Sequence, residues 1–337
     1  MKKLLLLQVI LVLAIQVFNA QSITFISERN SKPLSKVSVF GKNGNLLAQS
    51  DIDGKIDKQT LNPPQEKYEI VYNNTSVATL PYSDFEKDQI KVNDRVKEIQ
   101  EVVISKKPAK YLYMKGNFNT YVTVNNKLNC YADGVVTYIF DNNTKKLKST
   151  NVQQYRVYTL SDPKEEKKLT ASWDYQSDME VPNIKHIGNL EKYRIHYPDI
   201  KELKGDRKDE MEMTDKFLQK QPLAFLGFRL FDMRDVLNIS YEKDSQKTLK
   251  DFLEYNELNF AKVKHKSEPE FNAVIDYKNF YPTDISFSNE NDIEKVKFDR
   301  DNSNYKTKYW QDPSFPNMQS IFSSYFKNDL IEKENKH

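Results

Sequence analysis

A hairpin pattern occupies residues 37–48, which read Val37-Ser38-Val39-Phe40-Gly41-Lys42-Asn43-Gly44-Asn45-Leu46-Leu47-Ala48. The first four residues alternate with the period of two that is typical of a β-strand. Asn-Gly between two apolar runs is a strong signal for a tight hairpin turn. The segment therefore predicts two short antiparallel strands joined by this turn.

Further short strands and turns surround this hairpin. We predict strands at residues 23–26, 68–72, 90–92 and 99–104, and a second tight turn at residues 51–56. Several short strands separated by turn signals are typical of an all-β sandwich. The sequence therefore predicts a small antiparallel β-sandwich over residues 21–105.

Three motifs in this region resemble the carboxypeptidase regulatory-like domain, a transthyretin-like β-sandwich that is also called the peptidase-associated domain. The motifs are Lys32-Pro33-Leu34 followed by Val37-Ser38-Val39, then Ser50-Asp51-Ile52-Asp53-Gly54-Lys55-Ile56, and finally Glu101-Val102-Val103-Ile104. The resemblance covers residues 22–105. It implies an accessory module without catalytic residues, of the kind that precedes TonB-dependent receptors and related exported bacterial proteins.

A larger domain is predicted after a linker at residues 106–110. Strand-like segments at residues 118–124, 128–140 and 146–158 are separated by short turn-rich loops. Short loops between neighbouring strands favour an antiparallel meander. We therefore predict a β-rich domain of α+β type over residues 111–330, and a mainly β fold class for the whole chain.

The rest of this domain has a mixed pattern. Residues 200–218 have a composition typical of helix, and Pro222 would limit any continuation. They predict a helical insertion between two strand sets. A terminal helix is predicted at residues 318–330, followed by a frayed tail at residues 331–337. The second strand set is predicted to comprise residues 238–241, 260–264, 271–277, 284–288 and 293–298.

The first twenty residues have the pattern of a secretory signal. Lys2 and Lys3 precede an apolar run at residues 4–18, and the segment ends in a small residue, Ala20. This run is shorter than the roughly 20 apolar residues that a spanning helix needs. We predict a signal peptide at residues 1–20 that is cleaved after Ala20, with an uncleaved N-terminal anchor as the alternative.

The destination follows from what surrounds this signal. No cysteine lies near the cleavage site, which disfavours a lipid-anchored lipoprotein. The longest later apolar stretch, residues 223–231, contains Gly227 and Arg229, so we predict no transmembrane segment after cleavage. The sequence predicts an exported protein that is periplasmic or associated with the outer membrane, and residues 101–104 add to the outer-membrane assignment.

Charge and cysteine content restrict the possible partners. The chain has 51 Lys and Arg residues against 48 Asp and Glu residues, a balance that gives no support for nucleic-acid binding. Cys130 is the only cysteine, so it cannot form a disulfide within the chain. Its apolar, strand-like surroundings predict a buried and inert thiol.

The common catalytic motifs are absent from the sequence. None of the four histidines, His186, His196, His265 and His337, belongs to an H-E-x-x-H motif. No G-x-S-x-G, phosphate-binding or dinucleotide-binding loop occurs. We therefore predict no catalytic, cofactor-binding or metal-binding residues, and a non-enzymatic protein.

Three acidic residues, Asp51, Asp53 and Asp57, resemble a fragment of a calcium-binding loop around Gly54. A complete EF-hand loop needs a glutamate at its twelfth position, and Asn62 stands there in this chain. A plain β-turn is therefore the favoured interpretation of this segment.

Three functions remain open. The first is a binding or scaffold protein of the envelope, with the N-terminal sandwich as a docking module. The second is a carrier of a lipid or other hydrophobic ligand in a half-barrel, an architecture similar to that of periplasmic lipoprotein carriers. The third is a hydrolase in which His186 or His196 converges with two acids. The sequence leaves the oligomeric state open.

An open concave sheet would favour the carrier, and a filled core would favour the binding protein. Six aromatic residues would line the cavity of a carrier: Phe118, Tyr138, Phe140, Tyr155, Phe271 and Tyr277.

Overall fold

The computed structural model describes residues 22–92, 109–160, 175–217, 222–290, 293–312 and 330–337, apart from residues 29, 43, 73, 74, 196, 207 and 294. These residues form two compact units. Unit 1 contains described residues 22–92 and 306–312, and unit 2 contains described residues 109–305 and 330–337. The predicted strand at residues 99–104 and most of the predicted linker lie outside the described residues.

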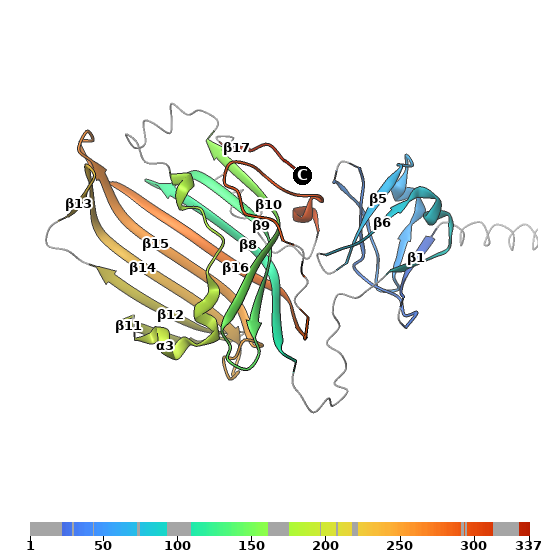
Figure 1. Cartoon of the computed structure of the whole chain (residues 1–337), viewed down its shortest axis with the longest axis horizontal. Helices are drawn as coiled ribbons and strands as arrows, with labels where there is room; N and C mark the ends of the chain where they lie inside the picture. The colour runs from blue at the N-terminus through green and yellow to red at the C-terminus, as the bar shows by residue number, and fades with distance from the viewer. Residues whose placement is uncertain are drawn as a thin grey trace, which may run out of the picture. The chain divides into compact units, whose positions relative to one another are not determined.

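Unit 1 is built from two small sheets (Figure 1). One sheet has the order β4-β1-β7 and the other has the order β3-β2-β5-β6. Every pair is antiparallel except β1 and β7, which run parallel. The strands are β1 (Ser22–Ser27), β2 (Ser38–Phe40), β3 (Leu46–Gln49), β4 (Lys55–Asp57), β5 (Lys67–Tyr72), β6 (Thr75–Pro81) and β7 (Gln89–Val92), with 3-10 helices η1 (Lys58–Leu61) and η2 (Tyr82–Glu86).

The two sheets of unit 1 share one hydrophobic core. Phe25 and Ile90 come from the first sheet and Val39 and Ile70 from the second, and all four are buried in the same cluster. Burial of alternate strand residues between two sheets is the arrangement of a β-sandwich. The sequence predicted the sandwich correctly, but it did not predict the parallel pairing of β1 with β7.

The acidic segment before β4 forms a tight turn. The Asp51 carboxylate accepts hydrogen bonds from the backbone N–H groups of Asp53 (2.9 Å) and Lys55 (2.8 Å). Gly54 has a φ of +74°, and a Cβ at this position would lie 2.6 Å from the carbonyl oxygen of Phe25. Only glycine fits this backbone without strain.

A segment far along the chain completes unit 1. Asp312 accepts a hydrogen bond from the Ser38 hydroxyl at 2.8 Å, and Gln311 accepts one from the Leu46 N–H at 2.7 Å. The Lys308 N–H donates to the carbonyl oxygen of Gly44, also at 2.8 Å. The sequence assigned these residues, which include the 3-10 helix η5 (Tyr309–Gln311), to the second domain, and no local pattern marks their return to the first.

Unit 2 contains a ten-stranded antiparallel sheet of long strands (Figure 1). Its order is β11-β12-β14-β15-β16-β8-β9-β10-β17, and β13 pairs with β14. The strands are β8 (Tyr111–Val124), β9 (Lys127–Asp141), β10 (Leu147–Leu160), β11 (Asp199–Lys204), β12 (Lys208–Phe217), β13 (Leu223–Phe225), β14 (Phe228–Glu242), β15 (Phe252–His265), β16 (Asn272–Ser288) and β17 (Leu330–Glu332).

The predicted meander corresponds to β8, β9 and β10. Asn125 and Asn126 join β8 to β9 and have φ values of 49° and 64°. Positive φ at both central residues is the geometry of a type I′ turn, which asparagine tolerates better than most residues. The sequence therefore predicted both the strands and the turn between them.

The prediction of a helix at residues 200–218 is wrong, because β11 and β12 form an antiparallel hairpin there. Met211 and Met213 of β12 are buried in the main core, and Glu210 and Glu212 alternate with them. This Glu-Met-Glu-Met pattern has the period of a strand. Pairing of β12 with β14 on its other side outweighs the helical propensity of the segment.

Two further strand predictions differ from the structure in the last part of unit 2. The strands predicted at residues 271–277 and 284–288 are one strand, β16, with an irregularity between Pro282 and Asp284. Among the described residues of the strand predicted at 293–298, Val296 forms an isolated bridge with Val152 and no strand is present.

The end of the chain is paired rather than frayed. Leu330, the last residue of the predicted terminal helix, begins β17, which pairs with β10. The carbonyl oxygen of Glu334 accepts a hydrogen bond from the Ser303 N–H at 2.9 Å. The rest of the predicted helix lies outside the described residues.

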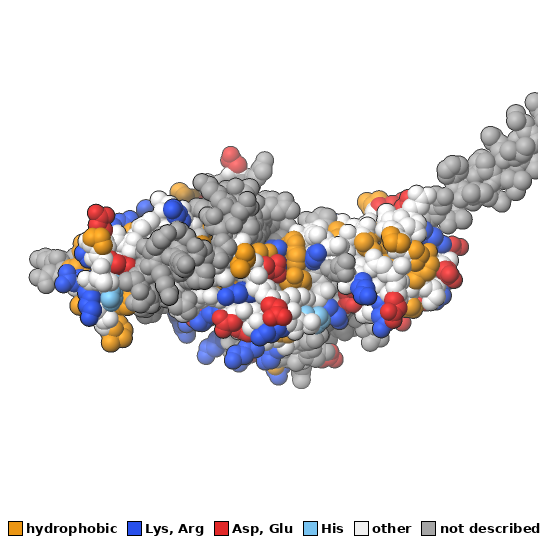
Figure 2. Space-filling view, turned by 90° about the horizontal axis from the view of Figure 1, so that it is seen from above, with side chains coloured by type: hydrophobic (Ala, Val, Ile, Leu, Met, Phe, Trp, Pro, Cys, Tyr) orange, Lys and Arg blue, Asp and Glu red, His pale blue; other side chains and the backbone are white. Residues whose placement is uncertain are grey.

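Lys and Arg side chains are interspersed with Asp and Glu on the face of the molecule that Figure 2 shows. This mixture agrees with the near balance of charges in the sequence.

A buried ion pair links β9 to β10. Asp133 and Arg156 are cross-strand neighbours, and Arg156 Nε donates to Asp133 Oδ1 at 3.0 Å. A second guanidinium nitrogen contacts the other carboxylate oxygen, which also accepts a hydrogen bond from the Tyr131 hydroxyl at 3.0 Å. Both side chains are nearly inaccessible to solvent, so loss of either charge would leave its partner in a buried site.

Replacement of Arg156 by methionine would remove the cation that contacts both oxygens of the buried Asp133 carboxylate. We expect Arg156→Met to lower the free energy of unfolding by about 3–5 kcal/mol, measured by urea denaturation. Arg194→Met is the matched control, because Arg194 pairs with Glu191 and Glu202 at a partly exposed site. The control variant should lower the free energy of unfolding by less than about 1 kcal/mol. Equal losses in the two variants would contradict the role assigned to the buried pair.

Candidate functional site

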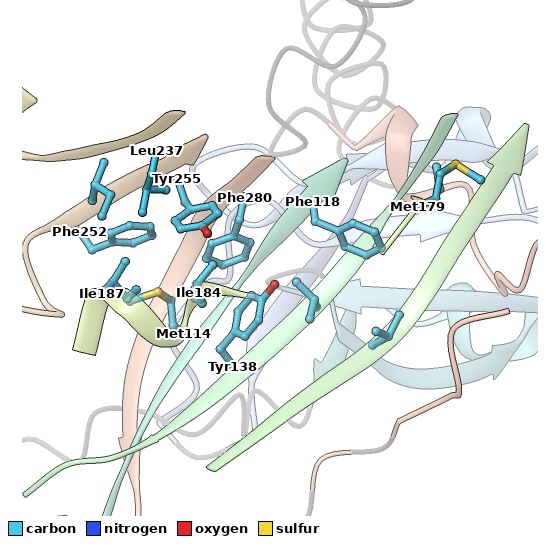
Figure 3. Packing of buried hydrophobic residues seen from close by; sticks show 14 of the residues in the cluster. Met114, Phe118, Tyr138, Met179, Ile184, Ile187, Leu237, Phe252, Tyr255 and Phe280 are labelled. Carbon is cyan, nitrogen blue, oxygen red and sulfur yellow. The ribbon is translucent and has the colours of Figure 1, made fainter. Parts of the chain in front are cut away.

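The main hydrophobic core of unit 2 covers one face of the ten-stranded sheet, which we call the core face. The covering residues come from the segment between β10 and β11, which contains η3 (Tyr175–Asp178), η4 (Ile184–Gly188) and the short helix α3 (Leu190–Arg194). Ile184 and Ile187 are buried among the sheet residues Met114, Tyr138 and Phe252 (Figure 3). The core face is therefore packed with side chains over this region.

Four of the six aromatic residues considered for a ligand cavity are part of this core. Phe118, Tyr138, Phe140 and Tyr155 are almost completely buried in it. The Tyr138 ring lies edge to face against Phe280 with the centroids 4.8 Å apart, and its hydroxyl donates to the carbonyl oxygen of Pro182 at 2.6 Å. These contacts tie the sheet to the segment that covers it.

The other two aromatic residues lie elsewhere. Tyr277 belongs to a separate cluster, where it stacks on Tyr121 with the ring centroids 4.5 Å apart. Phe271 is exposed and its ring centroid lies 6.2 Å from that of Phe231. The six residues therefore do not line one common surface.

The single thiol lies inside the core of unit 2. Cys130 is 1% exposed and its sulfur lies 3.6 Å from the carbonyl oxygen of Tyr175. The prediction of a buried thiol is confirmed.

The histidines do not gather at one place in the described part of the chain. The His186 ring packs edge to face against Tyr193, with the centroids 3.8 Å apart. His265 is at the end of β15, and His196 lies outside the described residues. Among the described residues, no group of three or more His, Cys, Asp or Glu side chains could hold a metal ion.

A row of charged side chains crosses the core face, and sequence reasoning did not predict it. The acidic row consists of Asp235 on β14, Glu257 on β15, and Asp276 and Lys278 on β16. Asn259 pairs with both Asp235 and Asp276, and Glu257 pairs with Lys278. Directly paired residues of antiparallel strands project from the same face of a sheet. Only the strand register reveals the row, because its members are distant in sequence.

Each acid of the row has at least one polar neighbour, and Glu257 has two, since Asn259 Nδ2 donates to Glu257 Oε1 at 3.1 Å. The Tyr197 hydroxyl donates to Asp235 Oδ2 at 3.0 Å, and the Tyr255 hydroxyl donates to Glu257 Oε2 at 2.8 Å. Lys278 Nζ lies 3.1 Å from Asp276 Oδ2.

Burial dominates the electrostatics of the acidic row. It raises the pKa of Asp276 to about 6, although Lys278 opposes the shift and Glu257 adds to it. Burial also raises the pKa of Asp235, opposed by the hydrogen bond from Tyr197. Burial is the largest single influence on Lys278 and lowers its pKa. The attractions to Asp276, Glu257 and Glu180 and the hydrogen bond with Asp276 together outweigh it, so the net shift of the pKa is upward.

The acidic row retains hydrogen-bonding capacity. Within the described part of the structure, one carboxylate oxygen of Asp235, one of Asp276 and the hydroxyl of the buried Thr120 have no hydrogen-bond partner. Thr120 pairs with Lys278 across β8 and β16, so it projects from the same face. These oxygens are inaccessible to solvent, so the row is a set of buried polar groups within the core face.

An exposed apolar hairpin lies at one end of the sheet. It consists of β13, the turn Leu226-Gly227 and the beginning of β14, with Phe225 paired to Phe228. Leu226 and Gly227 have φ values of 47° and 87°, as in a type I′ turn. Leu223, Phe225 and Leu226 are 49%, 63% and 80% exposed. These residues lie in the longest apolar stretch after residue 20, which is the signal that the sequence gives for this surface.

Comparisons with known proteins assign no function. A scan against protein-family models finds no match, and a search of curated proteins finds no similar sequence. The part of the chain that the structure describes contains no helix long and apolar enough to cross a membrane.

The raised pKa of Asp276 predicts a pH dependence of stability. The folded protein binds the Asp276 proton more tightly than the unfolded chain does, so the neutral form favours folding. This contribution is complete below pH 3.8 and is lost as the pH rises through about 6. The shift of about two units corresponds to up to about 3 kcal/mol.

We expect the free energy of unfolding of Asp276→Asn, relative to that of the original protein, to increase from about pH 4 to about pH 7. Urea denaturation at both pH values measures the difference. Asp199→Asn on the exposed strand β11 controls for the loss of one negative charge. A difference that stays constant with pH would show that Asp276 titrates as an ordinary surface carboxylate.

Proposed function

We propose that this chain is an exported, non-enzymatic binding protein of the bacterial envelope. The signal pattern at residues 1–20 supports the export route. The filled core face of unit 2 carries the rest of the proposal. A protein whose largest sheet is packed against its own chain binds its partner with its outer surface.

Packing on the core face favours this function over a lipid carrier. A carrier needs a concave apolar surface that the ligand, and not the protein, fills. Here Ile184, Ile187 and Met179 are buried against the sheet, and Met179 is fully inaccessible to solvent. Phe298 packs from another segment, 4.9 Å from the Tyr155 ring. Side chains of the protein therefore occupy the place where a carrier would hold its ligand.

Unit 1 fits the role of a docking or stabilising module. Its two facing sheets agree with the sandwich architecture that the sequence resemblance implies. The Asp51 carboxylate is used to close a turn, and the segment at residues 306–312 lies against the second sheet. These contacts support a structural function for the unit.

Among the described residues of unit 2, one surface is available for binding. The apolar hairpin offers large exposed side chains, whereas the unpartnered carboxylate oxygens of the acidic row are inaccessible to solvent. The hairpin is the candidate for a macromolecular partner, because exposed aromatic and Leu side chains gathered in one patch are typical of interaction sites.

The proposal predicts that the protein purified from the bacterial envelope has no resident ligand. Native mass spectrometry should give the mass of the chain from Gln21 to His337 without added mass. Incubation with peptide, ester and glycoside substrates should show no turnover.

A lipid bound at one copy per chain would contradict the filled core face and would support the carrier. Turnover that Asp276→Asn abolishes would contradict the non-enzymatic assignment. An N-terminus at Met1 in the envelope fraction would show that the signal is retained as an anchor.

A further inference from the structure

We propose that the apolar hairpin docks this protein onto an anionic lipid surface. The inference goes beyond the proposed function, because it assigns a partner of defined chemistry to one surface. It does not require a lipid inside the fold.

The turn end of the hairpin is apolar, as an element that inserts into lipid has to be. Leu226 occupies the turn itself, and Phe225 and Phe228 form the pair that closes it. Leu223 pairs with Leu230 two residues further from the turn along each strand, and this pair lies on the same face as Phe225 and Phe228. Apolar side chains at a turn can enter the boundary between headgroups and acyl chains without breaking the hydrogen bonds between the strands.

Cations lie directly behind this apolar end. Arg229 is paired with Lys264 on β15, and the Lys266 N–H donates to the carbonyl oxygen of Gly227 at 2.9 Å. Both Arg229 and Lys266 are exposed. Lys264 Nζ lies 5.9 Å from the centroid of the Phe271 ring. In Figure 2, orange and blue side chains lie together at the left end, where β13 lies in Figure 1.

Of the three described acids near the hairpin, Asp232 is paired with cations, while Glu268 and Glu270 oppose the three cations behind the turn. Asp232 lies 3.1 Å from Arg234 and 3.2 Å from Lys262, which neutralise it. Glu268 accepts a hydrogen bond from the His265 N–H at 2.8 Å. Glu270 is exposed and opposes the cations. Arg229, Lys264 and Lys266 still leave an excess of positive charge.

The combination favours a lipid surface over a protein partner. Lys and Arg next to exposed Phe and Leu side chains are typical of elements that lie in the interface of anionic membranes. The two faces of the hairpin differ near the turn, although Phe231 lies further along on the same face as Arg229. Phe225, Phe228 and Leu230 lie on one face, and Arg229 and Lys264 lie on the other. A hairpin of this kind can insert its apolar face while its cations reach the headgroups.

Vesicle flotation of the chain from Gln21 onward tests the proposal. We expect binding to phosphatidylcholine vesicles that contain phosphatidylglycerol, and weaker binding at high salt or to phosphatidylcholine alone. The double variant Phe225→Ser/Leu226→Ser should bind at least about tenfold more weakly. Lys264→Gln/Lys266→Gln should weaken binding severalfold on the anionic vesicles only.

Matched controls are available within unit 2. Ile195→Ser/Leu203→Ser also replaces two exposed apolar residues, which are 84% and 59% exposed. Lys201→Gln/Lys204→Gln removes the same charge from the exposed strand β11. Both control variants should bind as the original protein does.

A second measurement does not depend on a loss of binding. Leu226→Cys can be labelled selectively with an environment-sensitive fluorophore, because Cys130 is buried. Its emission should shift to the blue on addition of the anionic vesicles, and the emission of a label at Leu203→Cys should not shift.

Several results would overturn the proposal. The first is that the original protein does not bind the anionic vesicles, or that it binds neutral vesicles equally well. The second is that the variants Phe225→Ser/Leu226→Ser and Lys264→Gln/Lys266→Gln both bind as the original protein does. The third is that the label at position 226 shows no shift of its emission. Self-association that Phe225→Ser/Leu226→Ser abolishes, without vesicle binding, would assign the hairpin to a second copy instead. None of these results bears on the resident-ligand test, so the proposed function stands or fails separately.

Discussion

Pairing between β8 and β16 is the constraint on which unit 2 depends. It joins the early meander of β8, β9 and β10 to the later strands, with a register from Val274 opposite Val124 to Ser288 opposite Tyr111. Gly116 permits this close approach, because a Cβ there would lie 2.1 Å from the carbonyl oxygen of Tyr281. The same pairing places Phe118 opposite Phe280 and Thr120 opposite Lys278, so both the core and the acidic row depend on it.

Sequence patterns predicted the features that neighbouring residues determine. The alternation in residues 37–40 and the Asn125-Asn126 turn gave strands and a hairpin that the structure contains. The helix predicted at residues 200–218 failed because composition was weighed above the Glu-Met-Glu-Met alternation. The acidic row and the return of residues 306–312 to unit 1 depend on long-range pairing, and no local pattern encodes them.

In unit 2, the residues that stabilise the sheet and the residues that we propose for binding lie at different places. Buried aromatic residues of β8 and β9 are held against η4, and the Asp133–Arg156 pair links β9 to β10. Exposed apolar side chains are instead concentrated at the end of β13 and β14. A well-packed core tolerates few changes, whereas a short hairpin turn can change without disturbing the sheet. This division lets the surface that we propose for binding change without loss of the sheet that carries it.

The most direct test of the filled core face is the reactivity of Cys130. It is the only thiol of the chain and lies in the core of unit 2, 3.6 Å from the carbonyl oxygen of Tyr175. A small disulfide reagent should react with it only as fast as the protein unfolds, and denaturant should accelerate the reaction. Reaction of the native protein at the rate of an exposed thiol, slowed by added fatty acid, would show an open ligand cavity and contradict this account.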